Sequence, residues 1–387
     1  MEKKVKILIH DYAGHPFQFE LSKELSNNNS HVIHAFYAND PGPKGDFYND
    51  HNLNFIPVGK NIASSKKNLI KRQLGDILYG VELYKLIKTE KPDIVLSGNT
   101  PTISQHFALL ATKQIKSSFI FWSQDIYHLG LKKIINKKYL GIGFLIYLFY
   151  LLVDVYQYRR SDQIIVIGDF FKKYIEGLGI TKNKINIIQN WGHVPLSKIK
   201  NYSKSKAKDE FNFIYTGTMG AKHCPEYIGN LAKAINGMAL IDIYASGSGL
   251  VELKNNFGNQ DNLNINPLIP DHAFAKVLRN SSCALVSIKS KSLEYSIPSK
   301  VLNYIAAELP ILLITDKPNF LSNFIIENKI GIVIFEYENF HNKSVEMINN
   351  NEIRKVFSNA SRLYSLENFN INKKSKEFLK VFSKLTK

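Results

Sequence analysis

Cysteine is scarce in this chain of 387 residues. Its two cysteines, Cys224 and Cys283, belong to no C-x-x-C or C-x-x-x-H pair, so neither a disulfide framework nor a structural zinc site is expected. An Asp-x-Asp dyad is also missing, and we expect no resident metal or other cofactor. The start, MEKKVKILIH, has too short an apolar part for a signal peptide and is interpreted as a first strand, which favours the cytosol.

Acidic residues are few in comparison with basic ones. The chain has 33 Asp and Glu against 50 Lys and Arg, a formal net charge of +17. Such a surplus fits a nucleic acid, an anionic membrane face or a phosphorylated small molecule as partner. A genome biased toward Lys, Asn and Ile would produce the same surplus without selection for binding. Since no helix-turn-helix or RNA-binding aromatic motif is recognisable, nucleic acid is the least favoured partner.

Long apolar runs are absent as well. The longest uncharged apolar stretch, residues 139–153, falls short of the ~20 residues that a membrane-spanning helix needs. Two interpretations stay open: a segment lying in the headgroup region of an anionic leaflet at the inner face of the cytoplasmic membrane, or a helix buried in the first domain. Basic residues on both sides of the stretch favour the first: Lys132, Lys133, Lys137, Lys138, Arg159 and Arg160.

What the sequence does contain is a regular alternation of short β-type runs and helix-length segments. Most runs are continuously apolar, which is typical of strands buried on both faces of a parallel sheet. The runs are 5–10, 31–37, 93–99, 118–125, 162–169 and 184–190, then 211–217, 239–247, 263–269, 283–288, 310–315 and 330–335. Between the two series, residues 195–210 are rich in Lys and Ser, as in a linker.

This pattern predicts an α/β protein with two Rossmann-like doubly wound domains that face each other across a cleft. We expect an N-terminal domain at 1–194, the linker at 195–210 and a C-terminal domain at 211–365. A last helix within 366–387 could pack back on the N-terminal domain. Because open parallel sheets bind ligands at the carboxyl ends of their strands, the cleft is the expected site.

One helix start is well suited to an anion. In YSIPSKVLNYIAAELP (295–310), Pro298 is expected as the first helical residue. The amides of Ser299, Lys300 and Val301 would then point out of the helix start, beside a hydroxyl and an ammonium group. Together they suit a phosphate or diphosphate. The alternative is an ordinary helix start with a solvated lysine.

Two strand ends in the same domain support the anion site. Residues 215–223, YTGTMGAKH, and 244–249, YASGSG, each predict a strand that runs into a turn of small residues. Each pattern is weak alone, but their order along one domain predicts a single nucleotide pocket formed by both turns and the helix start.

These stretches resemble the retaining glycosyltransferases of family 4, which have the GT-B fold, and more narrowly the branch that builds bacterial surface polysaccharides, including fucosamine transferases. The resemblance covers nearly the whole chain and is carried by residues 97–111, 122–130, 158–175, 185–192, 213–220 and 297–310. It implies that the second domain binds a nucleotide-sugar, with uridine as the base, and that the first domain binds a polyprenyl-diphosphate-linked glycan. It also implies the groups around the donor: Gly14, Gly217, Thr218, Gly220, Lys222, Gly247, Ser299, Lys300 and Val301.

The chain departs from this family at several positions. Many members carry two glutamates separated by seven residues, one near the sugar and one near the ribose. Here Asn303 stands in the second position and would hydrogen-bond a ribose hydroxyl, whereas Tyr295 stands in the first, with Glu294 beside it as the candidate to reach the sugar. Glu308 and Cys224 stand where many members have glycine, so a left-handed helix end is in doubt at 308.

The resemblance implies sugar transfer with retention, without a metal. Lys222 and Lys300 would stabilise the charge that develops on the leaving diphosphate, and Asp125 would orient the acceptor unless it only caps a helix. His106 and His128 lie in the same region and are more often structural residues than ligands, and Trp122 and Trp191 are expected to be packing residues. A GT-B epimerase or phosphorylase and a non-catalytic sugar-nucleotide-binding module are the alternatives.

Overall fold

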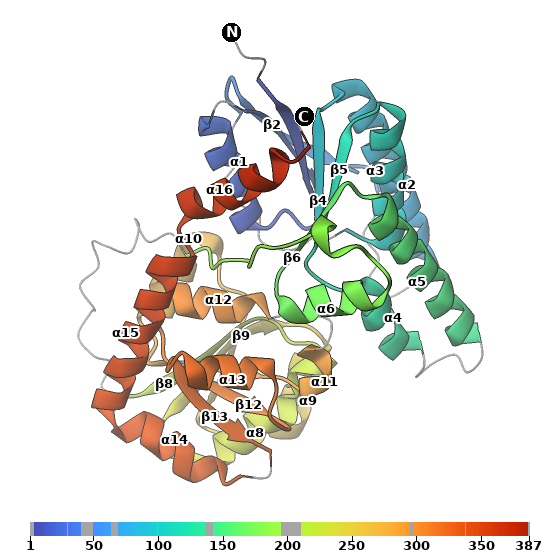
Figure 1. The fold of residues 1–387 in the computed structure, drawn as a ribbon. Coiled ribbons are helices and arrows are strands. Elements are labelled where there is room, and N and C mark those ends of the chain that lie inside the picture. Colours follow the sequence, from blue (N-terminus) through green and yellow to red (C-terminus); the bar gives the residue numbers. More distant parts are fainter. Residues whose placement is uncertain are drawn as a thin grey trace. The chain divides into compact units, whose positions relative to one another are not determined.

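The computed structural model describes residues 4–28, 30–39, 49–62, 69–98, 100–135, 142–194, 210–293, 298–336 and 338–385. The chain divides into two compact units (Figure 1). Unit 1 comprises Met1–Gln189 and Ile371–Lys387, and unit 2 comprises Asn190–Asn370. Nearly all of the expected linker, together with Glu294 and Tyr295, lies outside the described residues.

Unit 1 contains a parallel sheet of seven strands in the order β3-β2-β1-β4-β5-β6-β7. Because β1 pairs with both β2 and β4, the winding direction reverses between β1 and β4. This is the place where doubly wound sheets bind ligands, outside the carboxyl ends of the strands. The strands are β1 (Lys6–Asp11), β2 (His31–Tyr37), β3 (Leu53–Val58), β4 (Ile94–Gly98), β5 (Ser118–Ser123), β6 (Gln163–Val166) and β7 (Ile185–Ile187).

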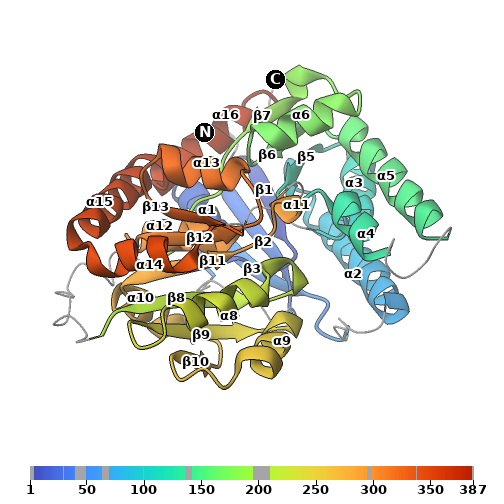
Figure 2. The same ribbon diagram turned by 90° about the horizontal axis from the view of Figure 1, so that it is seen from below.

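Helices cover both faces of this sheet. They are α1 (Pro16–Asn27), α2 (Leu69–Glu90), α3 (Thr102–Gln114), α4 (Tyr127–Ile135), α5 (Ile142–Arg160), α6 (Asp169–Gly177) and α16 (Ile371–Phe382), with a 3-10 turn, η1 (Lys182–Lys184). On one side α2, α3, α5 and α4 follow one another (Figure 2). On the other, α16 lies against α1, and the Phe378 ring sits 4.9 Å from the ring of Trp122. Trp122 is completely buried, as expected for a packing residue.

Unit 2 repeats the arrangement with six parallel strands in the order β10-β9-β8-β11-β12-β13. Here β8 pairs with both β9 and β11, so the reversal lies at the end of β8. The strands are β8 (Asn212–Thr218), β9 (Leu240–Ser246), β10 (Leu263–Asn266), β11 (Cys283–Ser287), β12 (Ile311–Thr315) and β13 (Gly331–Phe335). The helices are η2 (Ala221–His223), α8 (Pro225–Ala234), α9 (Ser248–Phe257), α10 (Asp271–Arg279), α11 (Ser290–Leu293), α12 (Ser299–Ala306), α13 (Phe320–Glu327), α14 (Phe340–Asn349) and α15 (Asn351–Asn368).

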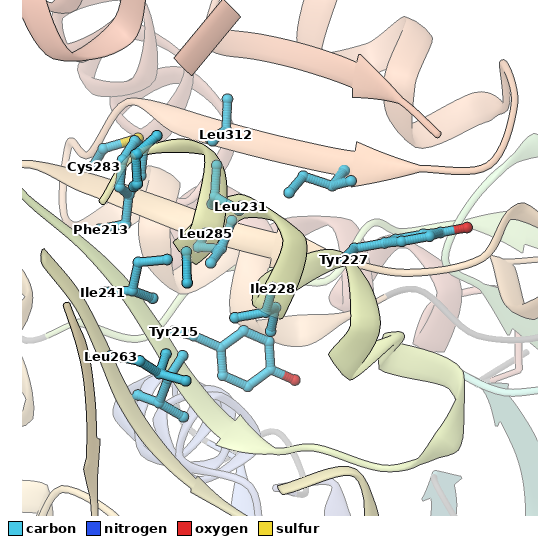
Figure 3. Packing of buried hydrophobic residues seen from close by; sticks show 14 of the residues in the cluster. Phe213, Tyr215, Tyr227, Ile228, Leu231, Ile241, Leu263, Cys283, Leu285 and Leu312 are labelled. Atoms are coloured by element: carbon cyan, nitrogen blue, oxygen red, sulfur yellow. The ribbon is translucent and has the colours of Figure 1, made fainter. Parts of the chain in front are cut away.

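The core of unit 2 has two layers, one on each face of the sheet. Tyr215 of β8 packs in a cluster with Ile228 and Leu231 of α8 (Figure 3). Its neighbour Ile214 belongs to the cluster on the other face, with Val301 of α12. Successive residues of a strand point to opposite faces, so both faces are apolar and the strands read as continuous apolar runs. The prediction of two doubly wound α/β units is confirmed.

Candidate functional site

Two glycine turns meet at the carboxyl ends of β8 and β9. The amide of Met219 donates to the carbonyl oxygen of Ser246 at 2.7 Å, and Gly249 N donates to the Met219 carbonyl at 2.8 Å. Gly217 has a φ of 89° and Gly247 a φ of 113°, both in the region that favours glycine. A Cβ on Gly247 would lie 2.7 Å from the Met219 carbonyl oxygen. The structure therefore joins the two predicted turns through a contact that only glycine permits.

Gly220 follows on the same turn, where β8 leads into η2. Its amide donates to Nδ1 of His223 at 3.0 Å, so Nδ1 acts as an acceptor. A Cβ added to Gly217 or Gly220 would meet no atom of the described residues within 4 Å. Unlike Gly217, Gly220 has an ordinary φ of −94°. The backbone at Gly217 and Gly220 is thus open to close approach, and Thr218 between them is exposed; contact of these residues with a phosphate stays a prediction.

The start of α12 differs in two details from the prediction. Pro298 is the residue before the helix, not its first residue, because its ψ of 110° is extended. The amide of Val301 was expected to point out of the helix; this is wrong, because it donates to the Pro298 carbonyl at 3.1 Å. The Val301 side chain is only 1% exposed and anchors α12 on the sheet. Ser299 is exposed at the helix start.

Lys300 reaches from α12 across the carboxyl end of β8. Its Nζ atom is buried and has no hydrogen-bond partner in the described parts of the chain. The nitrogen lies 3.6 Å from the centroid of the Tyr215 ring. Burial, and then the charge of Lys222, lower the pKa of Lys300 well below its ordinary value. A buried ammonium group without a hydrogen-bond acceptor is unfavourable, so the position calls for a functional explanation.

Lys222, His223 and Lys300, here called the basic cluster, act on one another. Burial lowers the pKa of His223 to about 3, and the charges of Lys300 and Lys222 contribute to the shift. Among the described residues, no carboxylate contributes to the pKa shift of Lys300 or of His223. Basic side chains that converge beside two glycine turns and a helix start form an environment that an anion would stabilise.

The segment before unit 2's sheet packs against α12 and fixes Asn303. The Oδ1 atom of Asn303 accepts a hydrogen bond from His193 N at 3.0 Å. A Cβ on Gly192 would lie 2.1 Å from the carbonyl oxygen of Leu302, so only glycine allows this approach. Trp191 is 2% exposed, which confirms it as a packing residue. The side-chain oxygen of Asn303 is thus occupied by the backbone of His193. A contact between Asn303 and a ribose hydroxyl stays a prediction.

The two positions where the resemblance expected glycine both keep the conformation of glycine. Cys224, at the start of α8, has a φ of 40°, and Glu308, after α12, has a φ of 60°. Left-handed backbone costs about 1 kcal/mol or more at a residue with a Cβ. The doubted left-handed end of α12 is therefore present, and Glu308 adopts it beside Arg279, whose Nη2 lies 3.9 Å from the carboxylate.

Replacing Glu308 by glycine is expected to stabilise unit 2. The change removes the strain at φ 60° for the loss of one long, partly exposed ion pair, which contributes little. We expect a gain of about 1 kcal/mol, a rise of roughly 2–4 °C in the melting temperature. Thermal unfolding followed by circular dichroism measures it. Glu346→Gly, in the exposed interior of α14, is the control and should lower the melting temperature by a similar amount.

In unit 1, the turn after β1 carries Gly14 with a φ of 71°. The amide of Gly14 donates to the Asp11 carbonyl at 3.2 Å, and the amides of Ala13 and His15 donate to the Asp11 carboxylate. Burial acts to raise the pKa of Asp11, but His15 and its amide lower it below the ordinary value overall. An internal carboxylate thus occupies the amides of this turn, and an approach of Gly14 to donor phosphates stays a prediction.

Asp125 is exposed two residues after β5 and two residues before α4, and its role toward an acceptor stays a prediction. His128 is completely buried. Its Nδ1 lies 2.7 Å from Oδ2 of Asp154, and its Nε2 lies 2.7 Å from the hydroxyl of Tyr174. His128 is therefore a satisfied structural residue. The ring of His106 lies 5.7 Å from the ring of Tyr156 in a tilted arrangement, and burial lowers the pKa of His106.

The apolar segment at 139–153 is largely helix α5, and its outer side chains are exposed. Residues 139–141 lie outside the described part of the chain. The interpretation as a buried helix does not fit Phe144, Leu145, Phe149 and Leu152, which are 52–63% exposed. The Tyr150 hydroxyl donates a hydrogen bond to Gln73 and so joins α5 to α2. Helix α2 has exposed apolar side chains of its own, which were not recognised from the sequence. We call the whole set the α2–α5 apolar surface: Leu74, Ile77, Leu78, Phe144, Leu145, Phe149, Leu152 and Tyr156.

Two features are absent from the described residues. None of the helices seen there has both the length and the apolar character to cross a bilayer. Nor do three or more His, Cys, Asp or Glu side chains come together there in a way that could hold a metal ion.

Comparisons with known proteins agree with this architecture. Residues 15–191 match the model of a family described as Glycosyltransferase Family 4. No curated protein matches the sequence significantly. Among solved structures, HepE of Anabaena in complex with UDP and glucose is similar, with a TM-score of 0.68 at 11% identity over 98% of this chain and 99% of that one.

Two further structures show how widely this fold is used. WaaG, a glycosyltransferase involved in lipopolysaccharide biosynthesis, has a TM-score of 0.61 at 12% identity over 98% and 99% of the two chains. A protein described as a UDP-N-acetylglucosamine 2-epimerase from Listeria monocytogenes has a TM-score of 0.58 at 12% identity over 97% and 95%. At such identities the likeness establishes the fold, which is that of GT-B glycosyltransferases, and no more.

Proposed function

We propose that this chain is a retaining glycosyltransferase of family 4 that moves a sugar from a nucleoside-diphosphate donor, with UDP as the expected nucleotide, to a lipid-linked glycan in bacterial capsule, O-antigen or exopolysaccharide synthesis. The observation that carries the proposal is the buried Lys300 nitrogen beside the turns of β8 and β9, which has no hydrogen-bond partner among the described residues. The family match over residues 15–191 and the UDP in the similar HepE structure support it.

Chemistry at this site would be electrostatic. As the bond between the sugar C1 and the diphosphate oxygen breaks, negative charge grows on the diphosphate, and Lys222, Lys300 and the first amides of α12 would stabilise it. The acceptor hydroxyl oxygen forms the new bond to C1 on the same face, and its proton passes to the departing phosphate oxygen. No separate base is then needed, and fixed dipoles stabilise the transition state more than the ground state.

The α2–α5 apolar surface supports docking of unit 1 to an anionic membrane face. Exposed basic residues border it on three helices: Lys71, Arg72, Lys132, Arg159 and Arg160. Apolar side chains that enter the acyl boundary, with cations at the headgroups, are typical of proteins that lie on a membrane without crossing it. Such docking would bring unit 1 to a polyprenyl-linked acceptor.

Incubation of the full chain with a panel of UDP- and GDP-sugars tests the proposed function. Release of nucleoside diphosphate that accelerates with membrane extract, together with a sugar added to a lipid-linked glycan, is the expected result. Conversion of the donor into an isomer that keeps its nucleotide would instead identify an epimerase. Binding without turnover of any donor would identify a non-catalytic module.

Replacing Gly220 by alanine is expected to weaken nucleotide binding without changing stability. Its φ is ordinary and an added methyl group meets no protein atom within 4 Å, so the fold should tolerate it. The methyl group would occupy space that donor phosphates need, and we expect at least about a tenfold loss of UDP affinity, the equivalent of roughly 1.4 kcal/mol. Titration calorimetry and thermal unfolding measure both quantities. Gly177→Ala at the end of α6 in unit 1, where an added Cβ also meets no described atom within 4 Å, should leave UDP affinity unchanged and should not lower the melting temperature.

A further inference from the structure

The surroundings of Lys300 favour its uncharged amine. A lysine ammonium group has three donors, and in water all three are bonded. Here Nζ is buried without a hydrogen-bond acceptor in the described residues, and its close neighbour is the face of the Tyr215 ring at 3.6 Å. The ring attracts a cation, whereas burial and the charge of Lys222 disfavour it. The pKa of Lys300 lies well below its ordinary value because burial dominates.

The other titratable groups around Lys300 hold a fixed charge state. The Tyr215 hydroxyl donates to the Thr218 carbonyl at 3.3 Å, and burial raises its pKa well above the ordinary value. Tyr304 of α12 hydrogen-bonds with Thr216, and burial raises its pKa to about 12. Burial likewise raises the pKa of the Cys224 thiol to about 12.

His223 is the other base in the cluster, and its geometry opposes protonation. Its Nδ1 accepts the amide proton of Gly220, and an acceptor that became protonated would lose that bond. The carboxylate of Asp316, which accepts hydrogen bonds from the amide and hydroxyl of Ser290, is not among the groups that shift the pKa of Lys300 or of His223. Lys300 is therefore the group whose charge an incoming anion can change.

We propose that the basic cluster binds a nucleoside diphosphate together with one proton, and that Nζ of Lys300 receives this proton. The inference rests on the proposed donor site. The proton comes from the solvent, and the amine lone pair of Lys300 accepts it. The resulting ammonium group pairs with a diphosphate oxygen instead of the Tyr215 ring. When the nucleoside diphosphate product leaves, the proton returns to the solvent.

This linkage has a definite sign. A group that binds a proton more tightly in the complex makes affinity highest at low pH and weakens it as pH rises through the pKa of the nucleotide-free protein. For one proton the loss is up to tenfold per pH unit. The terminal phosphate of the nucleotide has a second pKa near about 6 and is fully ionised above pH ~7.5, so it takes up no proton there.

Titration calorimetry with UDP at pH 8.5, in buffers of different ionisation enthalpy, measures the uptake. For the wild-type chain we expect the number of protons taken up per bound UDP to approach one. Lys300→Arg keeps a permanent positive charge, so it should bind UDP with no uptake. His223→Asn retains an acceptor for the Gly220 amide, and loss of proton uptake in this variant would identify His223, not Lys300, as the proton acceptor and overturn the inference. The pH dependence of wild-type UDP affinity is a second readout should Lys300→Arg bind too weakly.

Wild-type binding with no uptake and a flat pH profile would overturn the inference and leave the proposed function standing. Undiminished uptake in Lys300→Arg would overturn it too, since the proton would then go elsewhere. Absence of binding by UDP and by GDP would contradict the proposed donor site itself and, with it, the inference.

Discussion

Alanine in place of Lys300 lowers donor turnover at least about 100-fold on this account, because removal of one group that stabilises a developing oxyanion costs a factor of this order. The fold should not suffer, since no described residue loses a hydrogen bond with the Nζ atom. Removing a buried amine without an acceptor is neutral or favourable for stability. Release of nucleoside diphosphate under steady-state conditions, compared with the melting temperature, separates the two effects.

A matched control exists in the same unit. Lys233 also lies over an aromatic ring, with Nζ 5.0 Å from the centroid of Phe257, but it is exposed on α8. Lys233→Ala removes a lysine–aromatic contact of the same chemistry and should keep wild-type turnover. Equal turnover of Lys300→Ala and Lys233→Ala would rule out the catalytic role of Lys300.

Charge placed on the α2–α5 apolar surface is expected to abolish membrane docking. Leu145, Phe149 and Leu152 are 52–63% exposed on α5, so a triple change to glutamate should leave the core intact. Burying one such side chain contributes about 1.5–3 kcal/mol, and glutamate is also repelled by an anionic leaflet. We expect vesicle affinity to fall at least about 100-fold. Co-sedimentation with phosphatidylserine-containing vesicles, at low and high salt, measures it.

Helix α15 provides the control for this experiment. Val356, Leu363 and Leu366 are 53–57% exposed there, in unit 2. The same triple change to glutamate on α15 alters net charge equally and should leave vesicle binding close to wild type. Equal loss in both triple variants would mean that net charge alone accounts for binding, and no wild-type sedimentation at low salt would contradict the membrane proposal.

The strand series was predictable because buried parallel strands are continuously apolar. Strand β3 was missed, since Pro57 interrupts a run that alternates between buried and half-buried residues. Proline is tolerated there because β3 is the edge strand of the sheet. Helix α5 was recognised as unusual, but its contact with α2 depends on Tyr150 and Gln73, which are far apart in the sequence.

Within the candidate site, the backbone conformation was predictable where glycine marked a turn. Gly217 and Gly247 have the positive φ that such turns need, and the sequence order placed them at neighbouring strand ends. The left-handed conformations of Cys224 and Glu308 could not be predicted from the residue types, because neither residue is a glycine. Lys300 and Tyr215 are 85 positions apart in the sequence, so no local pattern predicts their contact. The same is true of the hydrogen bonds that His128 forms with Asp154 and Tyr174.

The most direct test of the central claim is a crystal structure of the chain with UDP. The account predicts the diphosphate within hydrogen-bond distance, about 3 Å, of the Lys300 nitrogen and over the turn at Gly217 and Gly220, with the ammonium group turned away from the Tyr215 ring. UDP bound elsewhere, with Lys300 still stacked on that ring, would contradict it.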